Sequence, residues 1–110
     1  MLVYLSQAYS NDPDAAYEKA LTVTRKMFEM GYMVFSPVVY FHKLSDPKDN
    51  YIFWLRKCLA MLDKCDVMVV LEDSESSYGV GVEIDFCEEH GKKIAYAHSE
   101  DLTSIVEHLF

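Results

Sequence analysis

Cysteine, positive charge and long hydrophobic runs are all scarce in this sequence. There are three cysteines, an odd count in a chain of 110 residues, and all fall in segments with apolar periodicity: Cys58, Cys65 and Cys87. A chain of this length folds without disulfides, so the thiols are expected to be reduced, as in a cytoplasmic protein. No stretch approaches the roughly 20 apolar residues of a membrane helix, and the N-terminus has no basic region before an apolar run. We therefore expect a soluble, unprocessed chain.

The shortage of positive charge limits the class of partner. Ten Lys and Arg residues stand against eighteen Asp and Glu residues, which gives a formal net charge of −8. Such a surface repels nucleic-acid polymers and anionic membranes, so neither is an expected partner. A small phosphorylated ligand is still compatible with this charge, because backbone N–H groups at a helix N-terminus bind one phosphate without a basic surface.

The rest of the composition indicates one hydrophobic core. Apolar residues make up 51% of the chain, and no repeat or linker is visible, so residues 1–110 are expected to form one domain. Short apolar runs predict four strands, at residues 2–5, 32–35, 67–71 and 94–97. Helical spacing of apolar residues predicts four helices. The first runs from a cap at Asn11 or Asp12 to Gly31, and the second passes through Leu55 and Leu62. The third runs from about Tyr78 to Gly91, and a short fourth one covers about residues 101–109. Residues 38–50 lack periodicity and are expected to form a loop.

The alternation of strands and helices predicts an α/β fold. The expected architecture is a three-layer, flavodoxin-like or Rossmann-like parallel sheet of about four strands with helices on both faces. Ligands of such sheets bind beyond the carboxyl ends of the strands, where the strand order reverses. Any site is therefore expected in the loops that follow the first three strands, at residues 6–11, 36–50 and 72–79.

The segment from Ser76 to Glu83 carries the clearest chemical pattern. Its serines and the glycines Gly79 and Gly81 offer hydroxyl and backbone N–H donors at the start of a helix, which suits one phosphate. Glu83 follows one turn later, where a carboxylate can act as a nucleophile or base. A structural interpretation also stays open, in which the serines are helix caps, the glycines allow close packing and Glu83 favours the helix dipole.

A few polar residues outside this segment are further candidates for ligand contacts. His42 lies in the loop after the second strand, beside aromatic Tyr40 and Phe41, and is a candidate contact for a base or phosphate. Arg56, next to Trp54, is a candidate phosphate partner or a surface ion pair. Cys87 and His90 have a spacing that can chelate, but no second ligand pair accompanies them. We therefore predict neither a metal site nor a cofactor.

Several short motifs in order resemble the nucleoside 2-deoxyribosyltransferase-like superfamily, which includes deoxynucleoside 5'-monophosphate N-glycosidases, and most closely a small bacterial and phage branch. These motifs are Tyr4-Leu5-Ser6-Gln7-Ala8-Tyr9-Ser10, Gly31-Tyr32-Met33-Val34-Phe35-Ser36-Pro37, Phe53-Trp54-Leu55-Arg56, Leu62-Asp63-Lys64-Cys65-Asp66 and Ser77-Tyr78-Gly79-Val80-Gly81-Val82-Glu83. The resemblance covers nearly the whole chain.

The resemblance implies that Glu83 is a nucleophile that attacks the anomeric carbon of a deoxyribosyl group. A covalent glycosyl-enzyme would then pass to water or to another base, through an oxocarbenium-like transition state that a carboxylate stabilises. It also implies substrate-binding residues at the end of the first strand, in the first loop and before the glutamate: Tyr4, Ser6, Gln7, Tyr9, Ser10, Ser77, Gly79 and Gly81. His42, in the loop after the second strand, is a further candidate. The family's assembly implies a homo-oligomer in which one subunit completes its neighbour's pocket.

Two departures from the family pattern bear on this implied activity. Cys58 stands where relatives usually carry an aspartate that positions the base or the nucleophile, and Asp63, one turn before strand 67–71, is a candidate substitute. Gln7-Ala8 also differs from the first loop of relatives. The sequence therefore leaves three hypotheses. The first is an N-glycosidase or deoxyribosyltransferase acting on a nucleoside or nucleoside 5'-monophosphate, and the second is a catalytically weak nucleotide-binding or sensing module of the same fold. The third, which the acidic surface permits, is a generic flavodoxin-like domain whose partner is another protein.

Overall fold

The computed structural model describes residues 1–103 and residue 105. Strands and helices follow one another in the order β1 (Leu2–Ser6), α1 (Pro13–Glu29), β2 (Met33–Phe35), α2 (Pro37–Phe41), α3 (Tyr51–Lys64), β3 (Val67–Leu71), α4 (Tyr78–Glu89) and β4 (Lys93–Ala97). The four predicted strands are confirmed, with ends that differ by at most one residue. No helix in the described part of the chain is long and apolar enough to cross a membrane.

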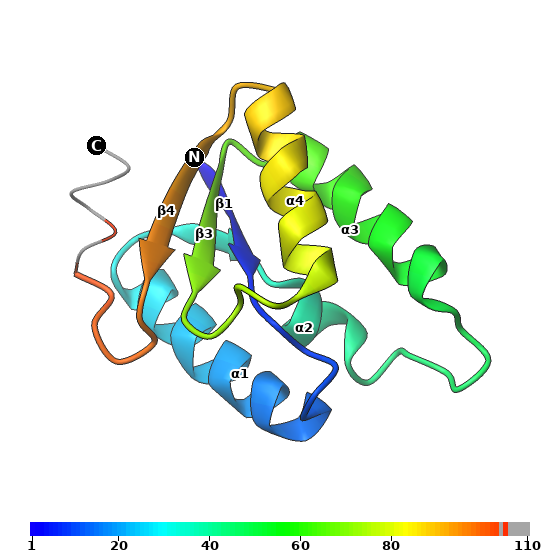
Figure 1. Ribbon diagram of the computed structural model, residues 1–110. Helices are drawn as coiled ribbons and strands as arrows, with labels where there is room; N and C mark the ends of the chain where they lie inside the picture. Colours follow the sequence, from blue (N-terminus) through cyan, green and yellow to red (C-terminus); the bar gives the residue numbers. More distant parts are fainter. Residues whose placement is uncertain (104, 106–110) are drawn as a thin grey trace.

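The four strands form one parallel sheet in the order β2-β1-β3-β4. Strand β1 pairs with β2 on one side, with Val3 opposite Val34, and with β3 on the other, with Val3 opposite Val67. All five residues of β3 are buried, as expected for a central strand covered on both faces. The strand order reverses between β1 and β3, and the carboxyl ends of these two strands lie at the same edge of the sheet (Figure 1).

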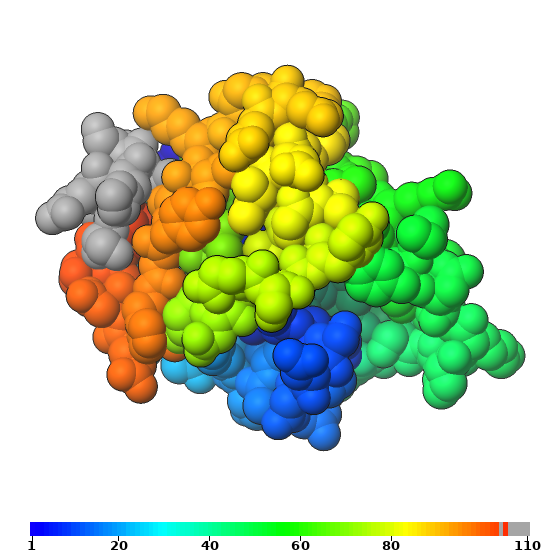
Figure 2. All heavy atoms as spheres, viewed as in Figure 1, coloured from blue at the N-terminus to red at the C-terminus, as the bar shows by residue number. Residues whose placement is uncertain are grey.

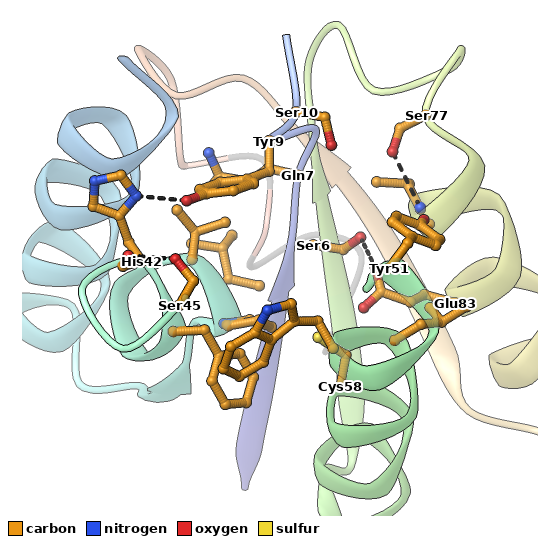
Figure 3. Close-up of a pocket in the computed structure, with 18 of the residues that line it drawn as sticks. Ser6, Gln7, Tyr9, Ser10, His42, Ser45, Tyr51, Cys58, Ser77 and Glu83 are labelled. Atoms are coloured by element: carbon orange, nitrogen blue, oxygen red, sulfur yellow. Dashed lines mark hydrogen bonds between the residues drawn. The ribbon is translucent and has the colours of Figure 1, made fainter. Parts of the chain in front are cut away.

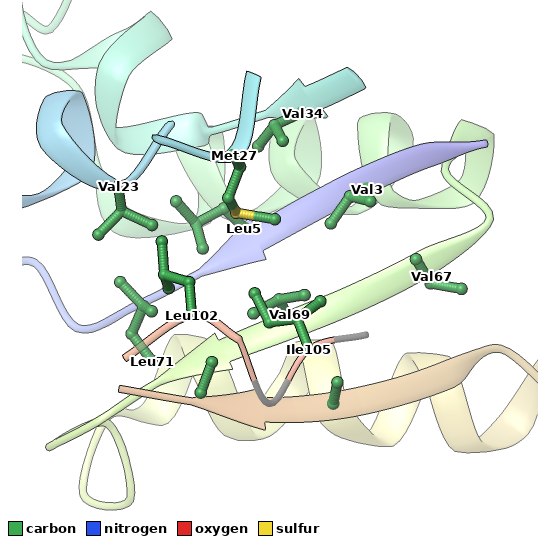
Figure 4. Close-up of a cluster of buried hydrophobic side chains, with 12 residues drawn as sticks. Val3, Leu5, Val23, Met27, Val34, Val67, Val69, Leu71, Leu102 and Ile105 are labelled. Atoms are coloured by element: carbon green, nitrogen blue, oxygen red, sulfur yellow. The ribbon is translucent and has the colours of Figure 1, made fainter. Parts of the chain in front are cut away.

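Helices cover both faces of the sheet, which confirms the predicted three-layer α/β fold. On one face, Val3 and Leu5 of β1 pack with Val23 and Met27 of α1, in a cluster that also contains Leu102 and Ile105 (Figure 4). On the other face, Tyr4 and Met68 pack against α3 and α4 in a second cluster, whose helix members include Leu62, Val80 and Cys87. The period-2 alternation along β1 thus sends Tyr4 towards α3 and α4, and its neighbours towards α1.

Side-chain caps set the helix starts. Asp12 accepts a hydrogen bond from the Ala15 N–H at 3.2 Å, so it, not Asn11, is the N-cap of α1. Asn50 caps α3 through the Phe53 N–H at 2.8 Å, and Ser77 caps α4 through the Val80 N–H at 3.3 Å. These caps fix where the first turns of α3 and α4 begin, next to the carboxyl ends of β1 and β3.

The structure corrects one prediction and leaves another outside its range. Residues 38–50 were expected to form a loop, but their first part continues the short helix α2, which Ser36 caps at the Val39 N–H and Pro37 begins. A five-residue helix is too short to show apolar periodicity, so the sequence pattern could not reveal it. The short helix predicted over about 101–109 falls largely on residues outside those described.

Candidate functional site

A cavity of about 370 Å³ opens at the carboxyl edge of β1 and β3. Its walls come from the loop after β1, from α2 and the segment that follows it, from the first two turns of α3 and from the start of α4. The loops after β1 and β3 lie side by side on the surface (Figure 2), where the Ala8 N–H donates to Ser74 Oγ at 3.2 Å. The cavity therefore lies at the reversal of strand order where the sequence placed it.

Glu83 forms part of the cavity wall, and its carboxylate is buried and doubly hydrogen-bonded. Only 7% of this residue is exposed. Ser6 Oγ donates to Oε1 at 2.8 Å (Figure 3), and the hydroxyl of the fully buried Tyr4 donates to Oε2. Both donors come from β1, so the strand holds the carboxylate that α4 supplies. This pair of bonds fixes the orientation of the carboxylate towards the cavity.

Burial and hydrogen bonding act in opposite directions on this carboxylate. Burial raises the pKa of Glu83 above its ordinary value, and the hydrogen bonds from Tyr4 and Ser6 partly lower it again. Burial and the negative charge of Glu83 raise the pKa of Tyr4, which therefore stays a neutral donor. The site thus contains a partly desolvated carboxylate held by neutral hydroxyl groups, an arrangement common to carboxylates that take part in catalysis.

Cys58 lies in the same part of the cavity, below Tyr51 on α3 (Figure 3). Burial, followed by the charge of Glu83, raises the pKa of the Cys58 thiol to about 11. The thiol is therefore neutral at physiological pH, and it brings no second negative charge to Glu83. Asp63, the candidate substitute for a carboxylate here, lies exposed at the far end of α3, where its carboxylate pairs with Lys64 at 3.8 Å.

The opposite wall carries a hydrogen-bonded histidine. His42 Nδ1 lies 2.6 Å from the Tyr9 hydroxyl, and its Nε2 lies 3.2 Å from the Asp14 carboxylate. Because an ionised carboxylate only accepts, we assign the hydrogen to Nε2, which leaves Nδ1 to accept from Tyr9. Tyr17 stacks on the imidazole with ring centroids 4.4 Å apart. Both ring nitrogens of His42 thus have a partner, and the side chain lines the cavity across from Glu83 (Figure 3).

The structure brings most of the predicted site residues to this one cavity. Glu83 lines it together with Ser6, Gln7, Tyr9, Ser10, His42, Ser77 and Gly79. Tyr4 donates a hydrogen bond to Glu83 but does not itself line the cavity, and Gly81 is not among the lining residues either. Gln7 is anchored by its side-chain N–H to the Ala16 carbonyl at 3.1 Å, while its buried Oε1 has no partner in the described structure. Arg56 does not line the cavity; it borders a separate surface hollow.

Apart from Cys58, sequence reasoning missed the contribution of the first turns of α3. Tyr51, Trp54, Leu55 and Cys58 all line the cavity, at the i, i+3, i+4 and i+7 spacing of one helix face. The Asn50 cap and this spacing are both visible in the sequence and could have predicted that these four residues share one face of the helix. Its direction towards Glu83 depends on how α3 packs on α4, which the sequence pattern does not specify.

The model of one protein family matches residues 1–96, and its description is "Domain of unknown function (DUF4406)". The chain belongs to the DUF4406 family. Among solved structures, this DUF4406 domain is similar to a 2-deoxyribosyltransferase from the psychrotolerant bacterium Bacillus psychrosaccharolyticus, with a TM-score of 0.61 and 19% sequence identity. The match covers 89% of the DUF4406 chain and 72% of the other chain. No curated protein gives a significant match.

The structural match supports a nucleoside 2-deoxyribosyltransferase-like fold for this DUF4406 domain. At such low identity it concerns the fold alone, so the chemistry of the cavity has to be argued from its own residues. Within the described residues, no group of three or more His, Cys, Asp or Glu side chains is arranged to hold a metal ion.

Proposed function

We propose that this domain cleaves or transfers the N-glycosidic bond of a nucleoside or nucleoside 5'-monophosphate, with Glu83 as the nucleophile. The observation that carries the proposal is the buried Glu83 carboxylate at the cavity wall, oriented by Tyr4 and Ser6. A cavity of about 370 Å³ with aromatic and aliphatic walls is of the size that small-molecule sites have. The deoxyribosyltransferase-like fold makes a nucleoside a plausible ligand.

The chemistry follows the double-displacement course of retaining glycosidases. A Glu83 oxygen attacks the anomeric carbon, the C–N bond breaks, and its electron pair passes to the base nitrogen, which takes up a proton from solvent water; the water or base that attacks in the second step returns a proton to the solvent. Water, or the nitrogen of a second base, then attacks the same carbon and releases Glu83 as a carboxylate. The hydrogen bonds from Tyr4 and Ser6 hold the attacking group, and the carboxylate stabilises the oxocarbenium-like charge in both steps.

A second candidate function is a weakly catalytic or inactive module that binds or senses a nucleotide. Cys58 favours it, because a neutral thiol beside Glu83 neither donates a proton readily nor accepts a strong hydrogen bond from the ligand. The remaining cavity is fully formed, so ligand binding would survive a loss of chemistry. A homo-oligomer of small-molecule-binding subunits is compatible with either function.

The experiment that separates the two is a base-release assay with a panel of deoxynucleosides, ribonucleosides and their 5'-monophosphates. Free base is followed by chromatography for the wild type, for Glu83→Gln and for Cys58→Asp. Release that disappears in Glu83→Gln supports the glycosidase or transferase. If no compound releases base but one of them raises the melting temperature of the wild type, the binding module is favoured. Release that appears first in Cys58→Asp would identify Cys58 as the reason for a lost activity.

A further inference from the structure

The charges around the cavity oppose a phosphate group. Of the described residues that line it, Glu83 and Asp49 are carboxylates, and none is lysine or arginine. His42 brings its Nε2 to the Asp14 carboxylate at 3.2 Å, so an acidic group already faces its outer side. Arg56 and Lys57 of α3 border the separate hollow formed with Ile52 and Phe53, where Lys57 Nζ lies 4.3 Å from the Phe53 ring centroid. Among the described lining residues, a phosphate dianion would meet two carboxylates and neither lysine nor arginine.

The N-terminus of α4 also has few free donors. The Ser77 N–H donates to the Ser74 carbonyl at 3.1 Å, and the Val80 N–H donates to Ser77 Oγ at 3.3 Å. The Gly81 N–H donates to the Ser77 carbonyl at 3.0 Å. Within the described part of the chain, this leaves the N–H groups of Tyr78 and Gly79 as the unpaired backbone donors of the first turn, beside the Ser77 hydroxyl, which accepts from Val80 and can still donate. A phosphate bound here would depend on them.

Tyr51 lies against this first turn at Gly79. A Cβ atom added to Gly79 would lie 2.5 Å from the Tyr51 hydroxyl oxygen and 3.6 Å from its ring carbon Cζ. The phenol therefore rests directly against the Gly79 backbone, and Figure 3 shows it between Ser77 and Glu83. The Tyr78 ring lies on its outer side, with centroids 5.9 Å apart. The absence of a side chain at Gly79 is what lets the hydroxyl approach this closely.

We propose that Tyr51 is a specificity-determining residue that closes the α4 end of the cavity to a phosphate, so that the ligand is an unphosphorylated nucleoside. The inference rests on the proposed function and narrows its substrate class. A neutral sugar hydroxyl can exchange a hydrogen bond with the Tyr51 hydroxyl without displacing it. A phosphate would have to displace the phenol from Gly79 and enter beside Glu83 and Asp49.

The first test compares a deoxynucleoside with its 5'-monophosphate in the base-release assay, by the ratio of their kcat/KM values. Repulsion between like charges predicts a wild-type ratio of about a hundredfold or more in favour of the nucleoside. Tyr51→Ala opens the α4 end and is expected to lower this ratio by about tenfold, since it removes the steric part of the barrier. Tyr96→Ala is the matched control, because Tyr96 is 60% exposed on β4 and does not line the cavity.

A second test checks the contact itself. Gly79→Ala places a methyl group 2.5 Å from the hydroxyl oxygen in the wild-type background, so the phenol must move. In the Tyr51→Phe background the nearest ring atom is 3.6 Å away, which is an ordinary contact. In the wild-type background, Gly79→Ala is therefore expected to raise the KM for the nucleoside about tenfold. In the Tyr51→Phe background the same substitution should change this KM by about twofold or less, because the two residues are coupled neighbours. Equal effects in both backgrounds would show that Tyr51 does not rest on Gly79 in solution.

The outcomes separate this inference from the proposed function. Base release from the monophosphate as fast as from the nucleoside would overturn the inference and leave the function intact. An unchanged ratio in Tyr51→Ala would also overturn it. The absence of base release from every compound would count against the proposed function, and the comparison would then be made by ligand-induced shifts in melting temperature. A preference for the nucleoside in the wild type that shrinks in Tyr51→Ala would still support the role of Tyr51, and an equal preference in both proteins, or stronger stabilisation by the monophosphate, would contradict it.

Discussion

At the scale of single residues, the site depends on a balance around one carboxylate. Burial raises the pKa of Glu83, which works against the ionised form that a nucleophile needs, while Tyr4 and Ser6 stabilise that form. The carboxylate is therefore expected to become active as the pH rises through its raised pKa, so the rate should fall on the acidic side. The hydrogen bonds from Tyr4 and Ser6 lower the pKa of Glu83, so they keep the acidic limb of the pH–rate profile from moving further towards neutral pH.

Tyr4→Phe tests this balance. Loss of the hydroxyl removes a hydrogen bond that lowers the pKa of Glu83, so the acidic limb of the kcat profile should move to higher pH. The plateau kcat should fall by about ten- to hundredfold, the typical effect of one hydrogen bond to a charged group. The measurement is the pH dependence of kcat and kcat/KM, with Tyr96→Phe as the control. An unchanged limb, or one that moves to lower pH, would contradict the role assigned to Tyr4.

At the scale of elements, the position of α3 decides what faces Glu83. Its first turns bring Tyr51 and Cys58 to the cavity, and its last turn is held by Lys92, which precedes β4. Lys92 Nζ donates to the Asp63 carbonyl at 3.1 Å and to the Cys65 carbonyl at 2.6 Å. These carbonyls belong to the C-terminal end of the helix, where a positive charge also favours the helix dipole.

Lys92→Met is expected to destabilise the protein by about 1–2 kcal/mol, because it removes both bonds and leaves the carbonyls of the α3 end without this donor. Urea unfolding should show a lower midpoint with an unchanged slope. Lys93→Met is the matched control, since Lys93 is the exposed neighbour and should change the stability little. Equal effects of the two substitutions would show that Lys92 does not hold α3.

The elements also show how far the sequence was informative. Apolar runs and caps predicted β1, β3 and the start of α4, because period-2 and period-3.6 patterns and short-range capping are local properties. The same patterns placed Glu83 and Ser6 at one edge of the sheet. They could not reveal α2, which is too short for periodicity, or the approach of Tyr51 to Gly79, which depends on the packing of two helices far apart along the chain. The chemical role of Glu83 stays a prediction.

At the scale of the whole molecule, several of the elements that border the cavity carry exposed large apolar side chains. The segment between α2 and α3 projects from one side of the molecule (Figures 1 and 2). Next to it and to α4, a group of apolar residues is between 42% and 71% exposed: Tyr40, Leu44, Ile52, Phe53 and Tyr78. Monomers seldom expose many large apolar side chains together, so this surface supports the predicted homo-oligomer.

The assembly prediction is tested by light scattering at micromolar concentration, which should give a mass above that of one 12.7 kDa chain. Ile52→Lys should shift the protein towards the monomer, because it places a charge in the apolar surface. Met33→Lys, on the exposed edge strand β2, introduces the same charge away from the cavity and should leave the mass unchanged. A wild-type mass of one chain would contradict the homo-oligomer.

The central claim is that Glu83 attacks the anomeric carbon, and trapping the glycosyl-enzyme tests it most directly. A 2'-fluoro-2'-deoxynucleoside slows both chemical steps, so the covalent intermediate should accumulate and be detected by mass spectrometry of the intact protein and its peptides. The account predicts one fluorodeoxyribosyl group on the peptide that contains Glu83, and none in Glu83→Gln. Attachment to another residue, or base release from the parent deoxynucleoside that is undiminished in Glu83→Gln, would contradict it.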